Sequence, residues 1–285
     1  MALITVDHVG IGYGFPRRQV LENIQLTIER GEFVCVLGQT GCGKSTLLRL
    51  LLGAEQPATG RILIDGVEHP RPDSTRGYVP QRYSLFPDKT VLANIMFGPE
   101  VTEFGLFKRV SPSFFRRRRE LRAQALGYLR RIGLHDSDAH KYPDQLSGGM
   151  QQRVAVAQAL MTSPRMLLMD EAFSALDAGT RRDMQTLIQD LWRATGTTVL
   201  FVTHNTEEAL RIGTRVVVLA KNHPDRGSRV ALDAVVPERS RAADLVKLAG
   251  DVECASAGDD AAGPSSRGRA RRPQVSSVSG RGAAR

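Results

Sequence analysis

The amino-acid sequence predicts an α/β fold built on a parallel β-sheet. Three short, unbroken apolar runs occur at residues 33–37, 166–169 and 198–202. Uninterrupted apolar runs of this length are typical of parallel strands that are covered on both faces. Helical patterns separate the three runs, which is the alternation expected when helices pack against both sides of such a sheet.

The first 65 residues favour β-strands over helices. One strand-like run ends at residues 27–30, and a second run, residues 61–64, leads into the pair Asp65-Gly66. An Asp-Gly pair after an apolar run is typical of a tight turn between strands. We therefore expect a β-rich N-terminal part.

The middle of the chain, residues 91–160, changes from a strand-like to a helical period. In one segment apolar side chains recur four, seven, eight and eleven residues after the first, which places them in one stripe along a helix. The stripe consists of Leu121, Ala125, Tyr128, Leu129 and Ile132. We expect this middle stretch to be a helical subdomain inserted into the α/β core.

The charge of the chain is concentrated in one place. The 285 residues include 39 Lys and Arg against 30 Asp and Glu, a formal charge of +9, and residues 108–131 alone contribute nine basic residues against one Glu, or +8. Residues 251–285 contribute six Arg against four acids, or +2, so the remainder sums to −1. A near-neutral body with one basic patch argues against a generally basic nucleic-acid-binding protein.

The patch itself includes four consecutive arginines, residues 116–119, that follow Phe114 and Phe115. Two interpretations stay open. The arginines could approach anionic lipid headgroups or an acidic face of a partner. Alternatively, they form an ordinary solvated helix face.

Several classes of protein are excluded or disfavoured by composition. No apolar run approaches the roughly 18 residues that a membrane-spanning helix needs, and the N-terminus lacks the basic and apolar regions of a secretory signal. The three cysteines, Cys35, Cys42 and Cys254, cannot form a disulfide framework and do not have metal-ligand spacing. These features predict a protein of a reducing cytosol.

The C-terminal part is expected to lie outside the main domain. Residues 251–285 are rich in Ala, Gly, Ser and Arg and carry few bulky apolar side chains, which predicts a disordered tail. Residues 226–250 are expected to form a short extension before the tail, and residues 245–248 in it are weakly helical.

A glycine-rich loop directly follows the first apolar run. It fits the pattern G-x-x-x-x-G-K-[ST] and precedes an apolar helical run, so strand, loop and helix occur in the order that a phosphate-binding loop requires. Its glycines let backbone amides wrap a phosphate, and the helix N-terminus adds positive partial charge. Lys44 would supply a full charge to the β- and γ-phosphates, and the Ser45 hydroxyl can bind Mg²⁺. The predicted ATP-binding residues of the loop are Gly38, Gln39, Thr40, Gly41, Cys42, Gly43, Lys44, Ser45 and Thr46.

Cys42 lies inside this loop and allows two interpretations. The helix N-terminus could lower the pKa of its thiol and make the thiol reactive. Alternatively, Cys42 is simply a small side chain that fits the loop, which is the interpretation we favour.

The other two apolar runs end in polar side chains at the same predicted sheet edge. Asp170 and Glu171 follow residues 166–169, and His204 closely follows residues 198–202. Parallel α/β sheets bind ligands at the carboxyl ends of their strands. We expect Asp170 to hold Mg²⁺ or its water, Glu171 to polarise the attacking water as general base, and His204 to contact the γ-phosphate. Together with the glycine-rich loop, these residues predict a nucleotide-hydrolysing site.

An eight-residue segment, LSGGMQQR at 146–153, resembles the signature of the nucleotide-binding subunits of ATP-binding cassette (ABC) transporters. Other segments resemble further motifs of that family in the same order. Gln81 resembles the Q-loop glutamine, residues 174–177 resemble the D-loop, and His204 resembles the switch histidine. The resemblance covers residues 1–225. The residues of these motifs are most similar to those of ATPases of bacterial importers of the nitrate, sulfonate and taurine type.

One aromatic position near the N-terminus also resembles a family motif. Tyr13 matches the A-loop aromatic that stacks on adenine. Phe15, two residues further on, could be the stacking ring instead, or both rings could serve packing.

The resemblance implies a P-loop NTPase core with an N-terminal antiparallel β subdomain and an inserted α-helical subdomain. It places the core at residues 1–90 and 160–225 and the helical subdomain at about residues 91–159. It also implies a head-to-tail dimer, formed with a second copy of the chain or with a paralogous ATPase subunit, that encloses two ATP molecules. The contacts to the partner's ATP would come from Ser147, Gly148, Gly149, Met150 and Asp177. The catalytic residues would be Glu171, His204 and Gln81, and the Mg²⁺ ligands Ser45, Gln81 and Asp170.

The function implied by the resemblance is that of an ATP-hydrolysing subunit, with ATP and Mg²⁺ as cofactors, that drives solute import at the cytoplasmic face of the cell membrane. Nitrate, sulfonate or taurine-like anions are the expected cargo. Permease subunits and, indirectly, a solute-binding protein are the expected partners, and no specific nucleic acid is expected. The alternative is a soluble ABC ATPase that acts on nucleic acid or ribosomes. Such proteins typically carry two cassettes or a long coiled coil, whereas this chain has one phosphate loop and no heptad run.

Overall fold

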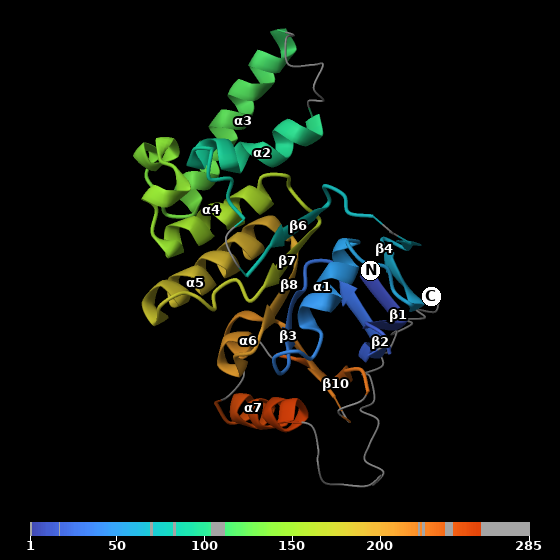
Figure 1. Cartoon of the computed structure of the whole chain (residues 1–285). Helices are drawn as coiled ribbons and strands as arrows, with labels where there is room; N and C mark the ends of the chain where they lie inside the picture. The colour runs from blue at the N-terminus through green and yellow to red at the C-terminus, as the bar shows by residue number, and fades with distance from the viewer. Residues whose placement is uncertain are drawn as a thin grey trace, which may run out of the picture.

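The computed structural model describes residues 2–16, 18–68, 71–81, 84–103, 112–221, 223, 226–236 and 242–257. In this part of the chain, two β-sheets and a helical subdomain pack together (Figure 1). The predicted α/β fold with an antiparallel β subdomain is confirmed. Among the described residues, no helix combines the length and the hydropathy that crossing a bilayer demands.

The larger sheet has the strand order β10-β9-β3-β8-β7-β6. Its three central strands, β3, β8 and β7, coincide with the three apolar runs and pair in parallel. All of their residues are buried, because helices cover one face and the second sheet with its helix covers the other. The strands of this sheet are β3 (Phe33–Leu37), β6 (Arg76–Val79), β7 (Met166–Asp170), β8 (Thr198–Thr203), β9 (Arg215–Ala220) and β10 (Arg229–Val235).

The smaller sheet is antiparallel and has the order β2-β1-β4-β5. It packs against α1 (Lys44–Leu52), and the two sheets share one apolar cluster around that helix (Figure 1). Asp65 and Gly66 join β4 to β5 with φ of 55° and 76°, the left-handed backbone that a two-residue hairpin turn requires. Its strands are β1 (Ala2–Tyr13), β2 (Arg18–Glu29), β4 (Thr59–Ile64) and β5 (Val67–Glu68).

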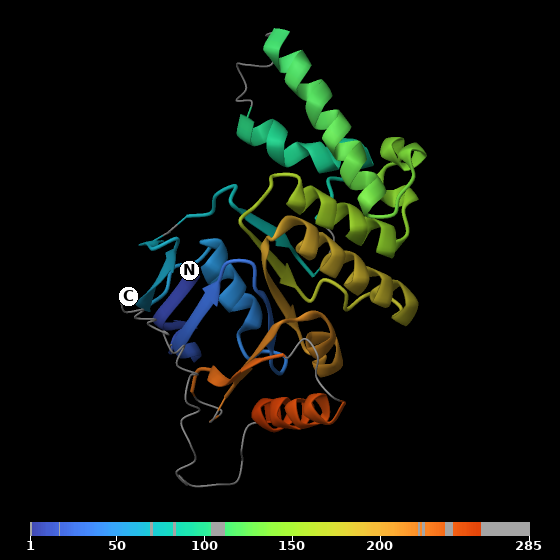
Figure 2. The same cartoon turned by 180° about the vertical axis from the view of Figure 1, so that it is seen from behind.

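Helices cover the opposite face of the larger sheet (Figure 2). The side chain of Phe33 on β3 meets Trp192 edge to face, with 5.8 Å between ring centroids, and Phe201 on β8 lies 5.1 Å from Phe173. These ring contacts fix α5 and the segment after β7 against the sheet. The helices are α4 (Gly148–Leu160), α5 (Ala178–Thr195), α6 (Thr206–Ile212) and α7 (Ala242–Ala257).

The helical subdomain rises from one end of this core (Figure 1). It consists of α2 (Val91–Glu103), α3 (Pro112–Arg131), one face of α4 and the 3-10 turns η2 (Asp136–His140) and η3 (Pro143–Gln145). Four residues of the predicted stripe are at most 1% exposed and face α2 and α4: Leu121, Ala125, Leu129 and Ile132. The fifth, Tyr128, is half-buried and donates from its hydroxyl to the Leu160 carbonyl.

The C-terminal part differs from the prediction. Residues 229–235 form β10, which pairs with β9 as the edge of the core sheet rather than standing outside it. The boundary expected at residue 250 falls inside α7, which continues to Ala257. Val252 is fully buried against the core, so this segment carries enough apolar surface to dock. The rest of the predicted disordered tail, residues 258–285, lies outside the described residues.

Candidate nucleotide site

Four loops meet at the carboxyl edge of the core sheet, because β3, β8, β7 and β6 are parallel neighbours. The glycine-rich loop follows β3, Glu171 follows β7, His204 follows β8 and Gln81 follows β6. Together they line a cavity of about 470 Å³, within the range of ligand sites in proteins. The side chains that the sequence predicted for one site therefore lie together.

Two glycines with positive φ set the backbone conformation of the glycine-rich loop. Gly41 and Gly43 have φ of 80° and 97°, which side chains rarely tolerate. A Cβ at Gly43 would lie 2.7 Å from Leu21 Cδ2, so β2 packs directly on the loop backbone. Because Gly43 is the N-cap of α1, the loop ends where the helix presents its free amide groups.

The Lys44 side chain folds back onto the glycine-rich loop and bonds to its backbone. This side chain is only 5% exposed, and Nζ donates to the carbonyl oxygens of Gly38 at 2.8 Å and Gln39 at 3.1 Å. Nζ also lies 3.7 Å from Glu171 Oε1. The ammonium group is thus held at the cavity wall, with its charge balanced by one carboxylate.

Ser45 and Asp170 form the second pair at the loop. The Ser45 hydroxyl donates to Asp170 Oδ1 at 3.0 Å across the start of α1 and the end of β7. Burial and the neighbouring Glu171 carboxylate raise the pKa of Asp170, against the Ser45 hydrogen bond and the charges of Lys44 and Arg49. One hydroxyl and one carboxylate suit Mg²⁺, which takes oxygen ligands, commonly one or two carboxylates with substrate phosphates. Among the described residues, no group of three His, Cys, Asp or Glu side chains forms a closed metal cage.

Glu171 is the centre of the polar contacts. Its Oε2 accepts from Gln81 Nε2 at 3.3 Å and lies 3.3 Å from His204 Nδ1. Its own backbone has φ of 44°, a left-handed conformation that is uncommon for a side chain of this kind, and its N–H donates to the Val202 carbonyl. The strand end therefore turns sharply and aims the carboxylate into the cavity, between Lys44, Gln81 and His204.

Tyr13 and Phe15 differ in how they are held. The Tyr13 hydroxyl donates to Glu55, which also pairs with Arg49 at 3.1 Å, and Arg49 lines the cavity. Phe15 is fully exposed. Tyr13 is thereby fixed beside α1, although neither it nor Phe15 is among the described residues that line the cavity. Glu55 and Arg49 were not anticipated, because no motif marks them.

Cys42 faces the protein interior. Its side chain is 4% exposed and belongs to the apolar cluster around α1. Burial raises the pKa of its thiol, against the opposing charge of Lys44. A raised pKa opposes thiolate formation, so the interpretation as a small packing residue is favoured over a reactive one.

The signature segment lies apart from the cavity. Ser147 is exposed and caps α4, where its hydroxyl accepts from the Met150 amide at 3.3 Å. Asp177 caps α5 in the same way and accepts from the amides of Gly179 and Thr180 at 3.0 Å. A Cβ at Gly149 would lie 2.6 Å from Thr180 Cγ2, so the starts of the two helices touch and a side chain at this position would displace Thr180. Within the described residues, none of these groups lines the nucleotide cavity.

A buried polar network supports the His204 loop and was missed by sequence reasoning. Glu208 is 7% exposed and accepts from the Thr203 hydroxyl at 2.5 Å and from Gln185 Nε2 at 3.0 Å. The order Asn205-x-x-Glu208 fits a capping box, which would have predicted the start of α6. The carboxylate instead turns inward and anchors the end of β8, next to His204.

Comparison with known proteins identifies relatives for most of the chain. A family model described as ABC transporter matches residues 21–174. The taurine import ATP-binding protein TauB of Burkholderia pseudomallei (strain K96243) is 40% identical over 235 residues, which are 82% of this chain and 85% of that protein. The aliphatic sulfonates import ATP-binding protein SsuB 1 of Burkholderia cenocepacia (strain HI2424) is 42% identical over 234 residues, 82% of this chain and 65% of that protein.

A solved structure shares the fold. It is the dimeric structure of a post-hydrolysis state of the ATP-binding cassette MJ0796 bound to ADP and Pi. The TM-score is 0.68 at 30% identity, and the match covers 83% of this chain and all of that one. Sequence and fold therefore point to the same group of proteins.

Proposed function

The chain belongs to the ABC transporter family, as an ATP-binding subunit that hydrolyses ATP to drive transport, and on that premise we propose that it powers the import of small organic anions. The observation that carries the residue roles is the position of Glu171, in contact with Lys44, Gln81 and His204 at the mouth of the glycine-rich loop. The cargo class is supported by relatives that import taurine and aliphatic sulfonates at about 40% identity.

The glycine-rich loop is proposed to hold the phosphates of ATP. The residues from Gly38 to Thr46 supply backbone amides, and Lys44 moves its ammonium group from the loop carbonyls to the β- and γ-phosphates. Glu171 takes the proton of the attacking water, while Gln81 and His204 orient the carboxylate and the terminal phosphate. Tyr13 supports the adenine ring.

Ser45 and Asp170 are proposed to hold Mg²⁺, with Gln81 reaching the same ion. When bound, the ion would neutralise negative charge on the phosphates. The hydrogen bond between the Ser45 hydroxyl and Asp170 supports this assignment, because it places two suitable oxygen atoms side by side.

Asp170→Asn is predicted to keep or raise the thermal stability of the protein while it lowers the ATPase rate. The raised pKa means that folded Asp170 binds a proton more readily than the unfolded chain does, so its contribution to the free energy of unfolding falls as pH rises toward neutral. The variant should therefore melt at or above the parent's temperature at pH 7, with a difference that vanishes at acidic pH. Its Mg²⁺-dependent ATPase rate should fall by about 100-fold.

Thermal unfolding across pH and phosphate release measure these two effects. Asp190→Asn is the matched control, because Asp190 is an exposed α5 carboxylate that contacts Arg193 rather than the cavity. A lower melting temperature at pH 7 together with parental ATPase would contradict both the charge argument and the metal assignment.

A head-to-tail dimer is proposed to complete the site. Ser147, Gly148, Gly149 and Met150 begin α4 at the surface, where the positive end of the helix can cap the γ-phosphate held by a second subunit, and Asp177 begins the neighbouring helix α5. The signature thus has a ligand only across an interface. The dimeric form of the MJ0796 cassette supports such an arrangement.

An uptake assay tests the proposed function. The chain is purified from membranes with its transmembrane partner and reconstituted into liposomes with the solute receptor and external solute on one side and MgATP on the other. We expect ATP-dependent accumulation of labelled taurine or hexanesulfonate, and no accumulation of the cation spermidine. ATP-driven movement of the sulfonates in the opposite direction, or preference for the cation, would contradict the proposal.

A further inference from the structure

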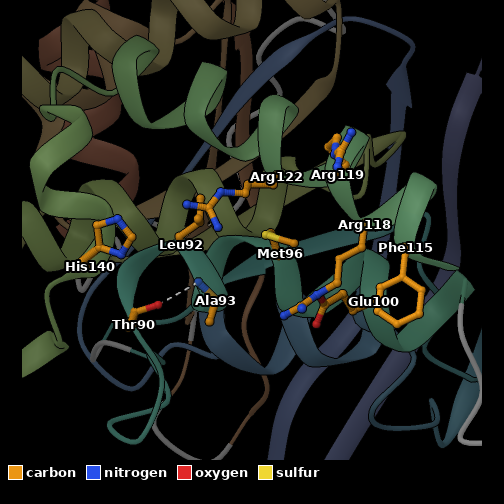
Figure 3. A pocket seen from close by; sticks show the side chains of 10 residues that line it. All are labelled: Thr90, Leu92, Ala93, Met96, Glu100, Phe115, Arg118, Arg119, Arg122 and His140. Carbon is orange, nitrogen blue, oxygen red and sulfur yellow. Dashed lines mark hydrogen bonds and ion pairs between the residues drawn. The ribbon is translucent and has the colours of Figure 1, made fainter. Parts of the chain in front are cut away.

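A second cavity, of about 350 Å³, lies between α2 and α3 in the helical subdomain (Figure 3). Its floor is apolar, since Leu92 and Met96 of α2 are 7% and 5% exposed. Phe115 of α3 stands at one end and is 63% exposed. In the described part of the chain, no residue lines both this groove and the nucleotide cavity.

One stripe of α3 forms the rim of the groove. Phe115, Arg118, Arg119 and Arg122 follow one another at intervals of three, one and three residues, which puts them on one side of the helix. Arg118 pairs with Glu100 of α2 at 3.0 Å. Within the described residues, Arg119 and Arg122 have no ion-pair partner, so two uncompensated positive charges border an apolar floor.

The other paired arginines of α3, Arg117 and Arg130, form ion pairs within the helical subdomain. Arg117 binds both carboxylate oxygens of Glu103 at 2.7 and 2.8 Å and also contacts Glu120. Arg130 binds Asp136 through two nitrogens. Among the described residues, Arg116 and Arg131 of α3 also lack a carboxylate partner, so what distinguishes Arg119 and Arg122 is that they border the apolar groove.

We propose that this groove binds a small organic anion with an apolar tail and that its occupancy alters ATP turnover. A sulfonate, carboxylate or phosphate head would accept forked hydrogen bonds from Arg119 and Arg122. The tail would cover Leu92 and Met96. The volume suits a short chain and lies at the lower end of the range of small-ligand sites. This inference does not depend on the proposed cargo, because the site is outside the nucleotide cavity.

A connection from the groove to the nucleotide site runs through Asn94 of α2. Asn94 is fully buried, and its amide donates to the carbonyls of Phe86, Lys89 and Thr90 at 3.0–3.1 Å, while its oxygen accepts from the Phe86 amide at 2.8 Å. These bonds clamp residues 86–90 onto the helix that forms the groove floor. The clamped segment follows Gln81, whose amide contacts Glu171. A ligand between α2 and α3 would therefore act on the helix that holds residues 86–90, and this segment follows Gln81 closely in the sequence.

Calorimetry on the full chain without nucleotide tests the binding. The probes are ethane-, butane- and hexanesulfonate, with inorganic sulfate as the head alone. We expect affinity to rise by about fourfold for each added methylene. Arg119→Ala with Arg122→Ala should weaken hexanesulfonate binding by about tenfold or more. Arg116→Ala with Arg131→Ala is the matched control, because both residues lie on α3, carry the same charge and do not line the groove. It should leave the affinity unchanged.

The same ligands test the regulation. Saturating hexanesulfonate should change the ATPase rate by about twofold or more in the parent and in the control pair, and not in the Arg119/Arg122 pair. Unchanged turnover with bound ligand would overturn the regulatory part of the proposal.

Four results would overturn the site itself. Sulfate that binds as tightly as hexanesulfonate would mean an adventitious ion only. Equal weakening by both arginine pairs would mean a diffuse charge effect, and displacement by ATP would place the sulfonate in the nucleotide cavity. Binding to phosphatidylglycerol vesicles through Arg119 and Arg122, without binding of the soluble sulfonates, would assign the groove to a membrane surface. The transport proposal could still hold in each case, because uptake and groove binding are measured separately.

Discussion

Glu171→Gln is expected to lower ATP turnover by about a thousandfold while ATP binding persists. The glutamine keeps the shape of the side chain and can still meet Gln81 and His204, which lie 3.3 Å from Glu171 Oε2. It can no longer take a proton from the attacking water. The γ-phosphate would then stay in place, and an ATP-dependent dimer should accumulate. Phosphate release and light scattering with MgATP measure the two effects.

Two further variants make this result specific. Glu207→Gln removes an exposed carboxylate from α6 and should behave like the parent. Ser147→Arg, added to Glu171→Gln, places a long cation at the exposed start of α4 and should abolish the dimer, because that helix start is proposed to cap the partner's phosphate. Turnover of the Glu171→Gln variant within about threefold of the parent would remove Glu171 from the role of general base.

The sheet edge was predictable because its causes are local in the sequence. Strands that are buried on both faces have unbroken apolar sequences. The glycine-rich pattern predicts a tight loop, because glycine tolerates the backbone conformation that such a loop requires. Once β3, β7 and β8 are parallel neighbours, the side chains that follow them must meet, which is why Lys44, Glu171 and His204 lie together. That the three strands are neighbours was inferred from the fold class. The observed pairing of β3 with β8 and of β8 with β7 confirms that inference.

Other parts of the site were not predictable, because their partners are far apart in the sequence and carry no motif. Glu55 reaches Tyr13 across 42 positions, and Gln185 meets Glu208 from another helix. Composition also misjudged the C-terminal part. The segment around Val252 looked too polar to fold, but a few apolar side chains on one side of α7 suffice when a finished sheet offers them a surface.

Lys44→Ala is expected to weaken ATP binding by about 100-fold or more, equivalent to about 2.7 kcal/mol. The substitution removes the ammonium group from the phosphates and leaves the Glu171 carboxylate, 3.7 Å away, without its counter-charge. The loop should stay folded, because its shape depends on Gly41 and Gly43, and the freed carbonyls of Gly38 and Gln39 face a cavity that water can fill. Titration with a fluorescent ATP analogue measures affinity. Lys247→Ala, at an exposed lysine of α7, is the control.

The two substitutions should not act independently. In the free protein Lys44 is shared between the loop carbonyls and Glu171, so ATP must compete with that carboxylate for the same ammonium group. Glu171→Gln removes the competition and a like charge near the phosphates, and should tighten ATP binding severalfold when Lys44 is present. In a Lys44→Ala background only the charge repulsion is left to remove, so the gain should differ from that in the parent. Strictly additive binding energies in this double-mutant cycle would show that the contact between Lys44 and Glu171 has no part in the free state's affinity for ATP.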